Sequence, residues 1–170
     1  EYTPFALGLL TLTGSITMIF LSVIALTEFN LKRIIVYATC SQLGLIILAV
    51  GISAYNAAIF HFVNFAFFNA LLFLSGGSII RSLGYKSDIR KMGGLYSKLP
   101  VTFILMYIGS FSISGIPFFS GYYSKEVIVS IAFLSKNSFS LFTLISIFFS
   151  SLLIAFIFWR VIFLIFHGEF

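Results

Sequence analysis

Charged residues are scarce in this chain. Of its 170 residues, only 9% are Asp, Glu, Lys or Arg, whereas an average soluble domain carries roughly 25%. The chain therefore has too few charges to cover a water-facing surface, and 60% of its residues are hydrophobic. This composition excludes a soluble globular domain, and it excludes an intrinsically disordered chain as well.

The chain also lacks the residue patterns of most catalytic and metal sites. Cys40 is the single cysteine, so no disulfide can form within the chain. No Cys and His residues have the spacing of metal ligands, and no Ser or Cys nucleophile has a recognisable partner. The formal net charge is +5, but no basic patch with interleaved aromatic residues indicates nucleic-acid binding. We expect no metal, cofactor or catalytic redox site on this chain, and no nucleic acid as its partner.

Long runs without any charge are the main feature that the sequence does have. They cover residues 2–27, 34–80, 99–124 and 137–159. A membrane-spanning helix needs about 20 predominantly apolar residues, and the runs lack the alternation of barrel strands. They predict an all-α integral membrane protein with a single transmembrane domain over residues 1–170. Its five predicted spans lie at about 5–27, 34–53, 57–81, 101–134 and 138–167.

The fourth predicted span contains residues that interrupt a helix. Pro117 cannot donate a backbone hydrogen bond, and Gly115 and Gly121 weaken the helix on either side. Neither half of the span reaches 20 apolar residues. We therefore predict one discontinuous helix, broken near residues 115–121, and not two separate spans.

Basic residues are distributed unevenly between the two sides of the membrane. One side receives only Lys136, whereas the other receives loops 28–33 and 82–100. Those two loops carry Lys32, Arg33, Lys86, Arg90, Lys91 and Lys98, and Arg81 adjoins the second loop on the same side. The positive-inside rule places the N-terminus outside and the loop 82–100 on the cytoplasmic or matrix side.

Lys125 is the most informative residue of the predicted spans. It precedes Lys136 by 11 residues, which is roughly 16 Å of helix and places it near mid-membrane. A lysine at that depth costs at least about 2.5–3.5 kcal/mol. Either the helix tilts and Lys125 snorkels, or Lys125 is a buried titratable amine in an ion path. The adjacent Glu126 cannot face Lys125 on a helix, so it pairs with another helix or chain or stays solvated in a water-filled crevice.

Other polar residues also lie within the spans. His61, Phe65 and Asn69 share one helix face, with Asn64 beside them. His61 is either a proton relay or a hydrogen-bonded packing residue, and Asn69 holds a water or bridges two helices. Gln42 lies in a cluster of small and polar residues that favours helix packing over a water wire. Arg160 is expected to snorkel at the end of the last span.

Five stretches of the sequence resemble a known family. They are Leu26-Thr27 through Lys32-Arg33 to Ser41-Gln42-Leu43-Gly44; His61 with Ala66-Phe67-Phe68, Ala70 and Leu72-Phe73; Gly77-Ser78-Ile79-Ile80; Asp88 to Leu95; and Pro117-Phe118, Gly121 and Tyr123-Ser124-Lys125 followed by an acid. Together they resemble chain 5 of NADH–ubiquinone oxidoreductase, an antiporter-like subunit of respiratory complex I. The octapeptide from Asp88 to Leu95, followed by the broken helix, favours this subunit over its paralogues.

The resemblance implies half of an antiporter-like helix bundle, about helices 9–13 of the family. Lys125 matches the central lysine of the family's broken helix, and His61 matches the outer of two histidines. The implied function is proton translocation in the membrane arm, coupled to electron transfer from NADH to ubiquinone. The implied location is the mitochondrial inner membrane, with loop 82–100 in the matrix. NADH, FMN, iron–sulfur clusters and ubiquinone would bind elsewhere in the complex, and membrane lipid and other membrane-arm subunits would be the partners.

Two departures from the family affect these expectations. Phe65 and Asn69 stand where the family has a second histidine and a lysine, so a water chain replaces that link or the proton path is rerouted. The family's first eight helices are also absent. This predicts a piece of a divided subunit whose missing helices lie on another chain, or a truncated longer chain. A stand-alone cation/proton antiporter subunit and a degenerate structural piece remain alternatives.

Overall fold

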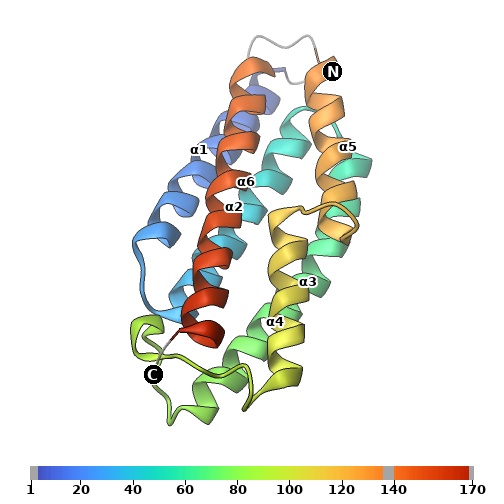
Figure 1. Cartoon of the computed structure of the whole chain (residues 1–170). Coiled ribbons are helices and arrows are strands. Elements are labelled where there is room, and N and C mark those ends of the chain that lie inside the picture. Colours follow the sequence, from blue (N-terminus) through green and yellow to red (C-terminus); the bar gives the residue numbers. More distant parts are fainter. Residues whose placement is uncertain (1–3, 136–139, 169–170) are drawn as a thin grey trace.

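The computed structural model describes residues 4–135 and 140–168, and this part of the chain is helical without any strand. Its elements are α1 (Pro4–Thr27), α2 (Leu31–Gly51), α3 (Tyr55–Ser82), a 3-10 turn η1 (Ile89–Lys91), α4 (Pro100–Ser114), α5 (Ser120–Leu134), α6 (Ser140–Ile162) and a π-helical turn η2 (Phe163–His167). The helices lie lengthwise in one bundle (Figure 1). The prediction of an all-α fold is confirmed.

Four of the described helices are long and apolar enough to cross a membrane: Pro4–Thr27, Leu31–Gly51, Tyr55–Ser82 and Ser140–His167. Helices α4 and α5 have 15 residues each, or about 22 Å, which is shorter than a hydrocarbon core of roughly 30 Å. They follow one another along the bundle (Figure 1), so together they form one interrupted crossing. Lys136, which the depth argument for Lys125 used, lies outside the described residues.

The helix boundaries differ by a few residues from those predicted. Helix α2 begins at Leu31 because the side chain of Asn30 accepts a hydrogen bond from the Lys32 N–H at 3.1 Å. Lys32 and Arg33 therefore lie in the first turn of α2 and not in a loop. Helix α3 begins at Tyr55, after a turn in which Ser53 has a φ of 62°.

Helices α1 and α2 approach each other closely through small residues. A Cβ atom on Gly14 would lie 2.6 Å from the Leu48 nitrogen, and one on Gly44 would lie 2.9 Å from the Met18 nitrogen. The Ser41 hydroxyl donates to the Met18 carbonyl at 2.9 Å. Small and hydroxyl residues are the usual means by which membrane helices pack, so this part of the polar cluster on α2 serves packing.

Two connections meet at one end of the bundle, which we call the loop end (residues 28–30 and 83–99; bottom of Figure 1). The Leu31 N–H donates to the Ser87 carbonyl at 2.8 Å, and the Ile89 N–H donates to the Phe29 carbonyl at 2.9 Å. Asp88 caps η1 by accepting from the Arg90 N–H. These bonds fix the two connections to each other.

Candidate functional site

A layer of buried polar side chains divides the apolar core. One apolar cluster lies toward the loop end and includes Ala38, Phe65, Ile113 and Ile154. The other lies toward the opposite end and includes Leu45, Ala58, Ile128 and Ile147. Between them along the helices lie the buried residues Ser22, Gln42, His61, Ser124, Lys125 and Ser150. The sequence-predicted polar residues of three spans are thus brought to one level of the bundle.

The helix interruption places Lys125 in this layer. Helix α4 ends at Ser114, and Gly115 adopts the left-handed conformation with a φ of 80°. Pro117 stands four residues after Ile113 and has no N–H, so the Ile113 carbonyl lacks its helical donor. The Lys125 Nζ atom donates to that carbonyl at 2.5 Å. The ammonium thus caps the C-terminal end of α4, where the helix dipole favours a positive charge.

Two glycines make room for this arrangement. A Cβ atom on Gly115 would lie 3.1 Å from the Lys125 Cδ atom, and a Cβ on Gly121 would collide with the Ser112 carbonyl oxygen. Gly115 is needed for its positive φ, whereas Gly121 is needed because α5 passes against the end of α4. The interruption lies in the predicted segment, but the role of Gly121 is close approach and not only helix weakening.

A pocket adjoins Lys125 between the interruption and α6. Its volume is about 260 Å³, and its lining residues include Ser114, Gly115, Tyr122, Lys125, Glu126 and Ser151. Such a volume accommodates several water molecules, each of which takes roughly 30 Å³. The Lys125 side chain is only 8% exposed, whereas Glu126 is exposed. Glu126 forms no ion pair with any residue in the described ranges.

His61 contacts Ser124, the residue that precedes Lys125 on α5. Its side chain is fully buried, and its Nδ1 atom lies 2.8 Å from the Ser124 Oγ atom. The Ser124 hydroxyl can donate to the Gly121 carbonyl at 3.2 Å. When it does, His61 Nδ1 carries the proton and Nε2 is an acceptor. The Nε2 atom is buried and has no hydrogen-bond partner among the described residues.

The polar path along α3 stops one turn beyond His61. Phe65 is buried and packs edge-on against Phe68, with ring centroids 5.6 Å apart. Asn69 lies a further turn away and is half-buried, and no described residue bonds its Oδ1 atom. The same is true of the Asn64 Nδ2 and Gln42 Oε1 atoms. No protein hydrogen bond in the described ranges therefore connects Asn69 to His61.

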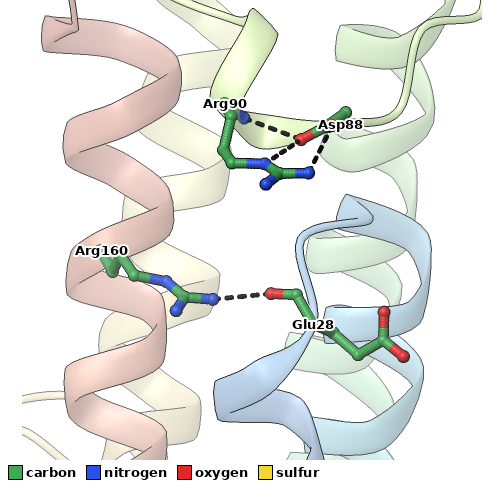
Figure 2. A network of polar contacts seen from close by, with 4 residues as sticks. All are labelled: Glu28, Asp88, Arg90 and Arg160. Atoms are coloured by element: carbon green, nitrogen blue, oxygen red, sulfur yellow. Dashed lines mark hydrogen bonds and ion pairs between the residues drawn. The ribbon is translucent and has the colours of Figure 1, made fainter.

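Sequence reasoning missed the contact of Ser124 with His61 and the carbonyl partners of Arg160. The Arg160 guanidinium reaches the loop end, where it donates to the Leu26 carbonyl at 2.8 Å and to the Glu28 carbonyl at 2.7 Å (Figure 2). These carbonyls belong to the C-terminal end of α1 and the residue after it. These bonds have a physical reason, because the last carbonyls of a helix lack helical donors and the guanidinium supplies them.

The guanidinium groups of Arg160 and Arg90 both lie near the aromatic ring of Phe29 at the loop end. The Arg90 guanidinium lies 4.0 Å from the Phe29 ring centroid, and the Arg160 guanidinium lies 5.5 Å from it. Arg90 pairs with Asp88 at 3.1 Å. The hydrogen bonds from Arg90 hold the pKa of Asp88 below its usual value. The described residues contain no group of three or more His, Cys, Asp or Glu that would hold a metal ion.

Comparisons with known proteins place these features in context. A family model described as NADH:quinone oxidoreductase/Mrp antiporter, transmembrane, matches residues 1–154. NADH-ubiquinone oxidoreductase chain 5 of Arabidopsis thaliana is 49% identical over 133 residues, which are 78% of this chain and 20% of that protein. NADH-quinone oxidoreductase subunit L of Rhodobacter capsulatus is 41% identical over 180 residues, with 99% of this chain and 25% of that protein covered.

Two solved structures share the fold. A chain of the membrane-bound sulfane sulfur reductase, an archaeal respiratory membrane complex, matches 97% of this chain with a TM-score of 0.86 and 29% identity, and 34% of that chain is covered. A chain of the Mrp complex from Dietzia sp. DQ12-45-1b matches 98% with a TM-score of 0.87 and 24% identity, and 31% of that chain is covered. The present chain thus spans a fifth to a quarter of its curated relatives and about a third of these structures.

Proposed function

The chain belongs to the NADH:quinone oxidoreductase/Mrp antiporter transmembrane family, and we propose that it forms part of a proton-translocating membrane-arm subunit of respiratory complex I. The observation that carries the proposal is Lys125: a buried ammonium bonded to the Ile113 carbonyl, beside a pocket that also contains Glu126. A cation in a membrane-spanning segment is costly and marks an ion or proton path.

The proposed mechanism uses groups on both sides of Lys125. A single hydrogen bond to the Ile113 carbonyl holds the proton on Nζ, and a change in nearby charge shifts the balance between the charged and neutral amine. Water in the adjoining pocket exchanges this proton on the side of Glu126. On the side of α3, the Ser124 hydroxyl and the His61 ring form the exchange route. A lysine suits this task because it can release its proton, whereas an arginine stays charged.

The rest of the proposal concerns location and partners. Names of the relatives support complex I of the mitochondrial inner membrane, and the basic residues of loop 82–100 support its placement in the matrix. NADH, FMN, iron–sulfur clusters and ubiquinone are assigned to other subunits, so this chain contributes no redox chemistry. Because the chain spans 20–25% of these relatives, we assign the remaining helices to the rest of the same subunit, on another chain or in a longer form of this one.

Two other functions have specific support. The family description includes Mrp antiporters, and the fold matches a chain of an Mrp complex, which favours a stand-alone cation/proton antiporter. A purely structural piece is favoured by the apolar Phe65–Phe68 pair on α3. Purification of the native assembly distinguishes the first alternative: flavin and iron–sulfur subunits accompany a complex I chain, and they do not accompany a stand-alone antiporter.

The test of proton translocation is Lys125→Met in the assembled complex. The initial rate of NADH-driven proton translocation, measured in sealed membrane vesicles, should fall roughly tenfold or more, because a positioned proton-transfer group contributes on the order of 10²–10⁴-fold in rate. The matched control is Lys86→Met, which removes an exposed lysine at the loop end. Normal pumping by Lys125→Met would contradict the proposed proton-relay function and favour the purely structural alternative.

A further inference from the structure

Glu126 is exposed on the surface of the bundle at the level of the polar layer. It directly follows the buried Lys125 on α5. Two adjoining hollows share Glu126, Val129 and Phe148 and together form a groove between α5 and α6, which we call the α5–α6 groove. Their volumes are about 260 and 590 Å³. Hydroxyl groups occur along this groove at Ser114, Tyr122, Ser130 and Ser151.

This groove cannot face hydrocarbon as it stands. A carboxylate inside the membrane is costly unless it pairs with a cation or with donors. In the described ranges no Lys, Arg or His forms an ion pair with Glu126. Lys125 lines the same groove, but its Nζ atom donates to the Ile113 carbonyl. A neighbour that covers the groove must therefore supply Glu126 with a cation or with hydrogen-bond donors, and a cation forms the stronger hydrogen bonds with a carboxylate.

The likeness to longer proteins indicates what covers it. The chain spans 20–25% of the curated relatives and 31–34% of the matched solved chains, so most of such a subunit lies outside these residues. By contrast, the exposed residues of α3 at Phe67 and Leu74 are apolar and suit lipid. The α5–α6 groove is lined largely by apolar side chains but also carries the exposed carboxylate of Glu126, so it suits a protein neighbour better than lipid.

We propose that the α5–α6 groove is the docking surface for a helix from the remaining part of the same antiporter-like subunit, and that this helix presents a Lys or Arg to Glu126. The proposal rests on the proposed function and adds to it the face of contact and the charge of the partner. An ion pair inside the membrane also selects the partner, because a like charge across the interface is strongly unfavourable and rejects the wrong neighbour.

The position of the partner helix can be tested by crosslinking in the assembled complex. Ser151 lines the groove and is half-buried, so Ser151→Cys with a short thiol-reactive crosslinker should yield one peptide from the rest of the subunit, with a Lys or Arg within it. The matched control is Leu74→Cys on α3, which is 73% exposed and should yield no such peptide. Crosslinking of Ser151→Cys to a different subunit, or its labelling by a lipid-phase maleimide as fast as Leu74→Cys, would overturn the proposal.

The charge of the partner can be tested by reversal. Glu126→Lys should lower the yield of assembled subunit at least tenfold, because like charges across an interface are strongly unfavourable and about 1.4 kcal/mol corresponds to a factor of ten. Changing the crosslinked Lys or Arg to Glu in the same cells should restore assembly. Unchanged assembly of Glu126→Lys, or no rescue by the second change, would overturn the proposal. These outcomes leave the proposed function standing, since that depends on flavin copurification and on pumping by Lys125→Met.

Discussion

Two regions of this molecule place a cation against the C-terminal carbonyls of a helix. At the helix interruption, Lys125 donates one hydrogen bond to the Ile113 carbonyl. At the loop end, Arg160 donates two hydrogen bonds, to the carbonyls of Leu26 and Glu28. In both sites the cation supplies hydrogen bonds and positive charge to carbonyls at a helix end, because the last carbonyls of a helix have no helical donors and carry partial negative charge.

The difference between the two sites lies in what surrounds each cation. Lys125 lies within the bundle, beside a pocket large enough for water, and its single hydrogen bond can be broken and remade. Arg160 lies against the Phe29 ring and is fixed by a planar guanidinium that cannot lose its proton. The comparison teaches that residue type and neighbourhood decide whether a helix-capping cation suits proton exchange or permanent attachment.

Exchange of the two cation types tests the comparison most severely. Lys125→Arg should impair pumping in vesicles as strongly as Lys125→Met, roughly tenfold or more, because the charge can no longer be released. Arg160→Lys should keep pumping intact and lower stability by about 1 kcal/mol, the net value of one hydrogen bond. Normal pumping by the Lys125→Arg complex would remove the relay role from this residue, while family membership would stand.

Displacing α5 from the end of α4 tests whether the hydrogen bond from Lys125 to the Ile113 carbonyl depends on the close approach of these two helices. Gly121→Ala should destabilise the assembled complex by about 1–3 kcal/mol, the usual cost of overpacking, because its Cβ would meet the Ser112 carbonyl oxygen. The control is Gly8→Ala on α1, where a Cβ would have no atom within 4 Å. Thermal dissociation of the complex in detergent measures both; equal midpoints for the two variants would contradict the geometry.

Removal of the Arg160 hydrogen bonds to the end of α1 should weaken the loop end and leave the rest of the bundle unchanged. Arg160→Leu leaves the Leu26 and Glu28 carbonyls without a donor and should cost about 1–3 kcal/mol. Arg33→Leu, which removes only an exposed pair with Glu28 at 3.6 Å, should cost between 0 and about 1 kcal/mol. Limited proteolysis of the loop 83–99 reports the difference. If both variants are cleaved at the same rate, Arg160 does not hold the end of α1.

The smallest effect concerns acidification at the loop end. Arg90 lowers the pKa of Asp88 from its usual 3.8, so the ionised carboxylate favours the folded loop. That contribution is fully present above about pH 4 and is lost as the pH falls further, through the lowered pKa. The contribution of this pair to the protease resistance of the loop should therefore be constant from pH 5 to 8, and below pH 4 the resistance should decline less steeply in Asp88→Asn than in the parent. An equal decline would exclude Asp88 as the titrating group.

Much of the architecture could be predicted from local sequence. Charge-free runs indicate spans because each span must satisfy its own backbone and expose apolar side chains to lipid. Pro117 and its flanking glycines predict the interruption because missing donors and backbone freedom are properties of single residues. Lys125 and His61 were predicted as site residues for the same reason, since polar groups are costly in a span wherever they lie.

Contacts between distant residues were decided by the tertiary structure alone. His61 and Ser124 are 63 positions apart, and Arg160 and Leu26 are 134 positions apart. No local pattern predicts such pairs, because which helix face meets which neighbour depends on the packing of the whole bundle. The Lys125 contact with Ile113 spans only 12 positions, yet it too required the fold, because α5 must first return against the end of α4. The sequence by itself thus determined which groups are costly to leave alone, and the packing of helices decided which partner satisfies each one.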